Sequence, residues 1–172
     1  MKNPKTFGVW GNIEKDAFWN VLPKIINWAK DKNLELFLTE KIISDVRAKE
    51  FDQPVINSKE KISEMDFMLV LGGDGTFLSC ARAVENRSTP ILGIHLGDLG
   101  FLAKVTLENI FQRLDQVSNG LFTVEKRSMV KASILKNGTS LTQYGLNDFV
   151  VSNGESHRML IAEVYVDDNR VS

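Results

Sequence analysis

Along residues 1–120, short apolar runs alternate with stretches in which apolar residues recur at helical spacing. The short runs, each typical of a buried strand, occupy residues 6–11, 34–38, 67–71 and 89–94. Helical spacing extends over residues 18–29 and again over 107–117, where Asn119-Gly120 indicates a helix stop. Residues 42–51 are mixed and predict no definite element. Alternating strands and helices indicate a parallel sheet, whose ligands bind beyond the carboxyl ends of the strands.

The pattern changes near residue 122 to β-rich segments separated by turn signals. The β-rich segments are residues 124–136, 146–151 and 160–166, and the turns are Asn137-Gly138, Asn153-Gly154 and Asp167-Asp168-Asn169. We predict an α/β, Rossmann-like parallel-sheet domain over residues 1–122. The beginning of an all-β, sandwich-like domain follows over residues 123–172, with the seam near residues 120–126.

About three strands are few for a stable sheet with a covered face. The chain is therefore interpreted either as a fragment or as a chain whose remaining strands come from elsewhere. An uncovered strand at residues 160–166 would expose backbone groups that recruit other chains. We expect the isolated chain to aggregate or to be partly disordered beyond about residue 122, and to fail in turnover.

Composition and charge narrow the class of protein. Hydrophobic residues make up 43% and charged residues 25% of the 172 residues, which is the balance of a soluble globular protein. A net charge of -1 gives no reason to expect nucleic acid or an anionic membrane as partner. The single Cys80 excludes an internal disulfide and suits a reducing compartment, and we interpret it as a small core residue. With no long apolar stretch at the N-terminus, we expect a cytoplasmic protein without a signal or membrane span.

A glycine-rich turn that carries one acid follows the apolar run at residues 67–71. Gly72, Gly73 and Gly75 allow positive φ and close approach of a ligand to the backbone, and Thr76 is predicted to cap the next helix. The turn therefore predicts a phosphate cradle that contains the carboxylate of Asp74. The alternative is a simple strand-to-helix turn with Asp74 as a capping acid. The turn lacks the lysine of a Walker A loop and the third glycine of the dinucleotide fingerprint.

A second glycine-rich loop, residues 95–102, follows the strand predicted at residues 89–94. Because both loops leave strand ends, we expect them to share one crevice.

Three motifs together resemble the NAD kinase family: Gly72-Gly73-Asp74-Gly75-Thr76, Leu99-Gly100-Phe101-Leu102 and Asn147-Asp148. The first motif alone is less specific, because diacylglycerol kinases, sphingosine kinases and phosphofructokinases carry similar loops. The resemblance implies phosphorylation of the 2′-hydroxyl of the adenosine ribose of NAD to give NADP. It implies ATP or polyphosphate as donor, a divalent cation, with Mg²⁺ expected, and a homo-oligomer, dimer or tetramer. The alternatives are a lipid or sugar kinase and a nucleotide-binding module without turnover.

The resemblance also assigns roles to individual residues. Asp74 is the expected proton acceptor, and the residues expected at the nucleotides are Gly73, Asp74, Gly75, Thr76, Phe101, Asn147, Asp148 and Arg158. Within this set Phe101 is expected to line the adenine pocket, and Asn147 and Asp148 to hold the NAD nucleoside. No side chain is assigned as a metal ligand.

Two residues depart from the family pattern. Asp148 stands where the family usually has glutamate, and His95 stands where it commonly has asparagine. The family's glycine- and threonine-rich segment, which supplies further NAD contacts, has no counterpart before Ser172. We interpret His95 and His157 as satisfied structural residues.

Overall fold

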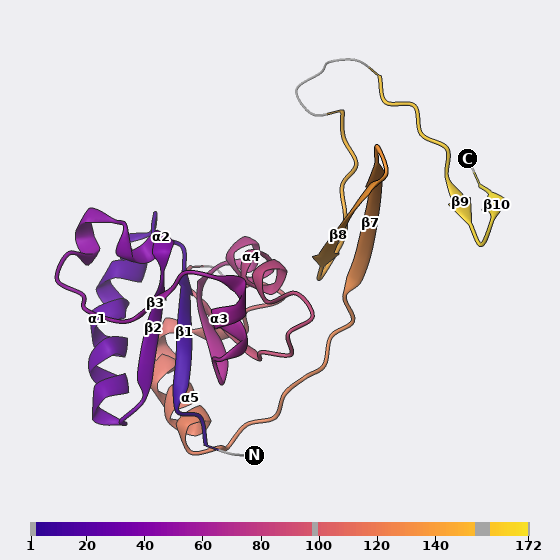
Figure 1. The fold of residues 1–172 in the computed structure, drawn as a ribbon. Coiled ribbons are helices and arrows are strands. Elements are labelled where there is room, and N and C mark those ends of the chain that lie inside the picture. The colour runs from indigo at the N-terminus through magenta and orange to yellow at the C-terminus, as the bar shows by residue number, and fades with distance from the viewer. Residues whose placement is uncertain (1–2, 98–99, 154–158, 172) are drawn as a thin grey trace.

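A six-stranded parallel sheet organises residues 6–106 in the computed structural model, which describes residues 3–97, 100–153 and 159–171 (Figure 1). Its strands are β1 (Thr6–Gly11), β2 (Glu35–Thr39), β3 (Val55–Ile56), β4 (Phe67–Gly72), β5 (Ile91–His95) and β6 (Val105–Thr106). They lie in the order β3-β2-β1-β4-β5-β6. The order reverses between β1 and β4, so a ligand crevice is expected beyond the carboxyl ends of these two strands.

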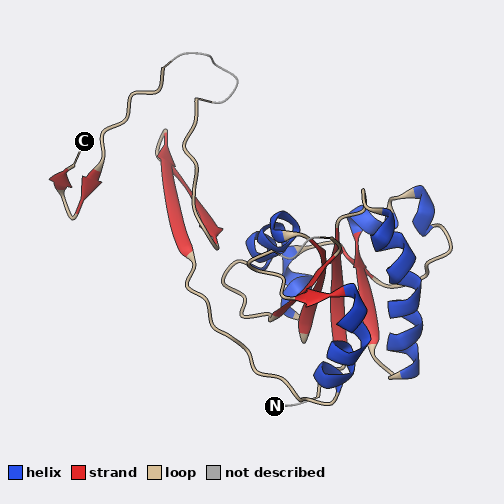
Figure 2. Cartoon of the chain, turned by 180° about the vertical axis from the view of Figure 1, so that it is seen from behind, coloured by secondary structure: helices blue, strands red, loops and turns tan. Residues whose placement is uncertain are grey.

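Helices cover both faces of this sheet (Figure 2). They are α1 (Asp16–Asp31), α2 (Glu40–Ile43), α3 (Lys59–Ser63), α4 (Asp74–Val84) and α5 (Ile110–Ser118), with 3₁₀ turns η1 (Val46–Ala48) and η2 (Leu107–Asn109). One core forms between the sheet and α1 and α5, and a second forms against α3 and α4. In β4, Leu69 and Leu71 enter the first core and Met68 and Val70 the second. Both faces are buried, which explains why this strand is a continuous apolar run.

The predicted parallel-sheet fold is confirmed. The four predicted strands and both long predicted helices occur within a few residues of their expected bounds. The two-residue strands β3 and β6 and the short α2, η1 and α3 had no detectable periodicity in the sequence, because so few residues define no repeat.

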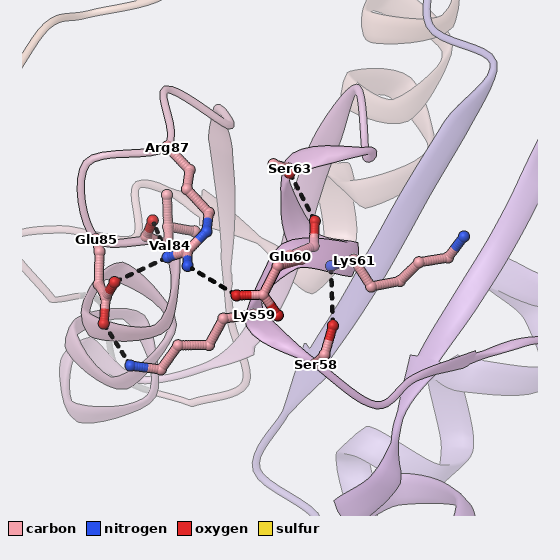
Figure 3. Close-up of polar contacts among 8 residues, drawn as sticks. All are labelled: Ser58, Lys59, Glu60, Lys61, Ser63, Val84, Glu85 and Arg87. Carbon is pink, nitrogen blue, oxygen red and sulfur yellow. Dashed lines mark hydrogen bonds and ion pairs between the residues drawn. The ribbon is translucent and has the colours of Figure 1, made fainter.

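Charged side chains tie α3 to the end of α4 (Figure 3). Glu85, directly after α4, accepts from Arg87 Nη1 at 2.9 Å and forms an ion pair with Lys59 of α3. Arg87 Nη2 also reaches Glu60 Oε1 at 3.5 Å. Hydrogen bonds from Lys59 and then Arg87 hold the pKa of Glu85 below its ordinary value. The network fixes one end of the helix whose other end carries Asp74.

The β-rich part consists of two separate hairpins rather than three long strands. β7 (Val130–Lys136) pairs antiparallel with β8 (Thr139–Gly145), and β9 (Tyr165–Val166) pairs with β10 (Asn169–Arg170). The first hairpin turns at Asn137 (φ 51°) and Gly138 (φ 77°), the positive-φ pair that a two-residue hairpin turn requires, so the predicted turn is confirmed.

Two of the predicted β segments were wrong. Residues 146–151 form no strand, and residues 160–166 are a strand only at β9. The tight turn pairs Lys136 with Thr139, so the second strand begins immediately after it. That strand went unnoticed because it is rich in threonine, serine and glutamine, which gave no apolar run.

An extended segment, residues 121–129, connects α5 to the β7–β8 hairpin, which stands away from the sheet and meets it through α4 (Figure 1). Large apolar side chains are exposed along this part of the chain, among them Leu121, Ile134, Leu135, Leu141, Val150, Val151, Met159, Ile161, Val164 and Tyr165. Among the helices in the described ranges, none is both long and apolar enough to cross a membrane.

Candidate functional site

The glycine-rich turn leads from β4 directly into α4. Gly73 is the N-cap in an extended conformation (φ −100°, ψ −170°), and the helix begins at Asp74. The prediction that Thr76 caps the helix was therefore wrong: Thr76 lies inside the first turn, where its N–H donates to the Gly73 carbonyl at 3.0 Å. None of Gly72, Gly73 and Gly75 takes a positive φ, contrary to expectation, because the chain passes from strand to helix without a left-handed residue. Gly72 is needed for close packing instead, since a Cβ there would stand 2.3 Å from Thr76 Oγ1.

The carboxylate of Asp74 is held by the backbone of the second glycine-rich loop. Phe101 N–H donates to Oδ2 at 2.9 Å, Leu102 N–H donates to Oδ1 at 3.1 Å, and Ala103 N–H reaches Oδ1 at 3.5 Å. These bonds, with that of Phe101 the largest cause, hold the pKa of Asp74 below its ordinary value, although desolvation opposes them. The carboxylate is thus ionised at neutral pH. Each carboxylate oxygen can accept two hydrogen bonds, so Oδ2 keeps an accepting position for a ligand.

Gly100 permits this contact between the two loops. A Cβ at Gly100 would stand 2.3 Å from Asp74 Oδ1 and 2.7 Å from His95 Nε2, both far inside contact distance. The prediction that the two loops share one crevice is confirmed by their hydrogen bonds.

A cavity of about 510 Å³ opens beside this carboxylate. Its lining comes from α4, the second loop, the connecting segment and the residues after β8: Asp74, Leu78, Phe101, Leu102, Arg127, Ser128, Leu146 and Asn147. The structure therefore brings together three of the predicted site residues, Asp74, Phe101 and Asn147. Phe101 is 92% exposed and contributes to the cavity lining, and it is its backbone N–H that makes the contact to Asp74.

The other predicted site residues do not line this cavity. Gly73, Gly75 and Thr76 form the turn and first helical turn behind Asp74, and Asp148 is exposed in the loop after β8. Arg158 lies outside the described residues.

Arg127 and Ser128 were missed by sequence reasoning. They come from the extended segment before β7, and Arg127 forms an ion pair with Glu125 at 2.8 Å. The one signal in the sequence was that a positively charged residue, Arg127, directly follows the predicted domain boundary at residues 120–126. Arg127 and Ser128 add a guanidinium and a hydroxyl to the lining that also contains the Asp74 carboxylate, and these groups can donate hydrogen bonds to an anionic ligand.

Cys80, His95 and His157 were interpreted as structural residues, and His157 lies outside the described residues. Cys80 is confirmed as a core residue of α4, and burial raises the pKa of its thiol to about 12. His95 is buried, but neither Nδ1 nor Nε2 has a hydrogen-bond partner among the residues that the structure describes. The interpretation of His95 as a satisfied residue was therefore wrong.

Within the described ranges, no group of three or more histidine, cysteine, aspartate or glutamate side chains is placed to hold a metal ion. Asp74 stands alone as an acid in the cavity lining and already accepts backbone hydrogen bonds. The described residues of this chain therefore do not form a metal cage of their own.

Comparisons with known proteins agree with this architecture. Residues 7–122 match the family model described as the ATP-NAD kinase N-terminal domain. The chain is 36% identical over 168 residues to the NAD kinase of Thermoanaerobacter sp. (strain X514), covering 97% of this chain and 58% of that protein. It is 34% identical over 165 residues to the NAD kinase of Syntrophotalea carbinolica (strain DSM 2380 / NBRC 103641 / GraBd1), covering 95% of this chain and 56% of that protein.

A solved structure, yeast NADH kinase complexed with NADH, superposes with a TM-score of 0.82 at 16% identity. The match covers 99% of this chain and 55% of that chain, and it shows a shared fold. The chain thus spans between half and three fifths of the length of these relatives. The family match, which covers most of the chain, shows that the chain belongs to the ATP-NAD kinase family.

Proposed function

We propose that this chain forms part of an NAD kinase, which transfers the terminal phosphoryl group of ATP to the 2′-hydroxyl of the adenosine ribose of NAD and releases NADP. The observation that carries the proposal is the Asp74 carboxylate at the cavity wall, held ionised by three backbone N–H groups with an accepting position left on Oδ2.

Asp74 accepts the ribose O–H and orients its oxygen toward the phosphorus. Because its pKa is lowered, the carboxylate is a weak base, so its main contribution is to aim the nucleophile. This suits phosphoryl transfer, whose transition state is loose and gains more from position than from early proton removal.

The remaining cavity residues fit the two nucleotides. Arg127 and Ser128 supply a positive charge and a hydroxyl for phosphate oxygens, and Asn147 can both donate to and accept from a ribose. Phe101 offers a ring for the adenine. Gly73, Gly75, Thr76, Asp148 and Arg158 remain proposed nucleotide contacts on the resemblance alone.

A divalent cation, Mg²⁺ by proposal, enters with the phosphates of ATP, because the described residues supply no cage for it. Bound there, it would neutralise charge on the transferred group. A cytoplasmic location and a homo-oligomer, dimer or tetramer, belong to the same proposal and rest on the resemblance and on the single cysteine.

The test offers the chain ATP and Mg²⁺ with NAD, NADH, a diacylglycerol or a sugar phosphate, and measures which acceptor is phosphorylated. It is run on residues 1–172 and on the same residues joined to the remaining C-terminal part of the Thermoanaerobacter relative. We expect the joined protein to form NADP from NAD and residues 1–172 alone to form none. In the joined protein, Asp74→Asn should lower kcat by about 10²–10⁴-fold with little change in NAD affinity. Phosphorylation of the lipid or sugar would refute the proposal, and nucleotide binding by the joined protein without phosphorylation of any acceptor would indicate a non-catalytic module.

A second variant tests the phosphate side of the cavity. Arg127→Gln should weaken ATP binding about tenfold, because a charge-assisted hydrogen bond to phosphate is lost. The matched control is Arg113→Gln on α5, which removes the same charge from a side chain bonded to Gln116. Equal ATP affinity in the two variants would remove Arg127 from the site.

A further inference from the structure

Lys15 lies in the loop after β1, and its side chain reaches the loop after β5. Its Nζ stands 3.1 Å from the point where a Cβ of Gly97 would lie. Leu96, the residue before Gly97, donates its N–H to the Gly72 carbonyl at 3.3 Å, so this part of the loop lies beside the glycine-rich turn. Because β4 lies between β1 and β5 in the sheet, the Lys15 ammonium group is placed at the carboxyl end of β4, where the chain turns into α4.

The backbone that carries Lys15 is held in place by two side chains. The Ile13 carbonyl accepts from Trp19 Nε1 at 2.7 Å and from Arg47 Nη2 at 2.9 Å, and Arg47 Cζ lies 4.4 Å from the centre of the Trp19 ring. The Lys15 side chain itself is exposed and makes no capping bond to α1. Within the described ranges, no salt bridge includes it. A fixed backbone with an unpaired ammonium group is suited to binding an anion.

The start of α4 offers donors and space for such an anion. The N–H groups of Thr76 and Phe77 both donate to the Gly73 carbonyl at 3.0 Å, whereas those of Asp74 and Gly75 have no acceptor within the helix. A Cβ at Gly75 would meet no described atom within 4 Å, and one at Gly73 would meet none nearer than 3.8 Å. Free N–H groups at the N-terminus of a helix favour phosphate oxygens.

The imidazole of His95 gives independent evidence for a polar ligand at this place. The residue is 9% exposed, and neither ring nitrogen has a hydrogen-bond partner among the described residues. Its Cε1, the carbon bonded to both nitrogens, is 3.8 Å from the Cβ position of Gly73, so the ring edge that carries both nitrogens faces the N-cap of α4. A neutral imidazole has one N–H donor, and buried donors in folded proteins are nearly always paired. A ligand oxygen at the start of α4 would supply the partner.

We propose that Lys15 binds the polyphosphate chain of the phosphoryl donor at the N-terminus of α4. The inference rests on the proposed kinase function, and it adds a donor contact that is absent from the lining of the 510 Å³ cavity. The ionised carboxylate of Asp74 repels phosphate oxygens brought beside it, so a positive charge is needed at this helix start. Lys15 supplies that charge, and the N–H groups of Asp74 and Gly75 add neutral donors. Arg127 contacts the same donor from the cavity lining.

The first measurement is binding, which requires no turnover. Isothermal calorimetry titrates ATP and inorganic triphosphate, each with Mg²⁺, into residues 1–172 and into the joined protein described above. Lys15→Gln should weaken the binding of both probes about tenfold, because a charge-assisted hydrogen bond is lost. Lys15→Arg keeps the charge and should retain most of the affinity. NAD should bind the joined protein equally well with and without the Lys15→Gln substitution.

The matched control is Lys24→Gln, which removes the same charge from another exposed side chain of α1. This control should bind ATP and triphosphate as the wild type does. Equal ATP affinity in Lys15→Gln and Lys24→Gln overturns the inference, as does a loss of NAD affinity in place of ATP affinity. Failure of both wild-type proteins to bind triphosphate overturns it as well.

The second measurement is the steady-state rate of NADP formation by the joined protein. Lys15→Gln should raise KM for ATP about tenfold and leave KM for NAD unchanged. If NADP forms and KM for ATP is unchanged in the variant, the inference fails while the proposed function stands. If the wild type forms no NADP, the proposed function fails, and the triphosphate titrations still decide whether Lys15 binds phosphate.

Discussion

Replacing Gly100 by alanine should disable the site while leaving the fold intact. The added Cβ would stand 2.3 Å from Asp74 Oδ1 and 2.7 Å from His95 Nε2. An ordinary contact begins at 3.4 Å, so either the loop or the carboxylate must move by about 1 Å.

A shift of that size is enough to break the hydrogen bonds at Asp74. The N–H groups of Phe101 and Leu102 lie 2.9 and 3.1 Å from the carboxylate, and a displacement of about 1 Å takes them out of hydrogen-bond range. Misplacement of a reacting group by 1 Å can cost about a hundredfold in rate. We therefore expect kcat/KM for NADP formation to fall about a hundredfold in Gly100→Ala, and the pKa of Asp74 to rise toward its ordinary value.

The assay combines three measurements: NADP formation, an NMR titration of the carboxyl ¹³C resonance of Asp74, and a thermal unfolding curve. The matched control is Gly97→Ala in the same loop, where the nearest atom is the flexible end of Lys15 at 3.1 Å. The control should retain the Asp74 titration of the wild type. If Gly100→Ala kept both full activity and the low Asp74 pKa, the loop would not fix the carboxylate and the reasoning would be wrong.

Two further predictions concern the helix that carries Asp74. Glu85 has φ 55° and ψ −126°, a conformation that favours glycine. Both Glu85→Gly and Glu85→Gln lose the ion pair to Lys59, so the two variants differ in backbone strain. The free energy of unfolding in urea should therefore be about 1 kcal/mol higher for Glu85→Gly than for Glu85→Gln. Equal stability would show that no strain is stored there. Cys80, whose thiol pKa is raised to about 12, should react with iodoacetamide at pH 8 only as fast as the protein unfolds, and rapid labelling of the folded chain would contradict its burial.

The fold could be predicted from the sequence wherever burial is two-sided. β4 is apolar at every position because both faces pack against helices, so its run of residues was unmistakable. The apolar pattern did not predict β8, because most of its side chains are exposed. The Asn137-Gly138 turn, which places Thr139 beside Lys136, indicates its register instead. A local turn predicted that hairpin better than the apolar pattern did.

The candidate site could be predicted only in part, because a sequence motif identifies residues but does not say which of their atoms make the contacts. The resemblance directed attention to Asp74 and Phe101, which both line the cavity, but it is the backbone N–H of Phe101 that bonds to the acid. Arg127 reaches the cavity through the tertiary placement of an extended segment, which no local pattern encodes. The unused nitrogens of His95 likewise become visible only once two distant glycine turns are seen to enclose it.

The acid and the second loop should therefore behave as one unit. Asp74 begins a helix that is fixed at its far end by Glu85, yet its carboxylate is bonded to residues 101–103 and to no other element among the described residues. Any change that displaces the loop must displace the carboxylate, whereas a change on the exposed face of α4 need not. Substitutions in residues 100–103 that leave the backbone free to adopt the same path should be tolerated even when their side chains change, because the site uses their N–H groups.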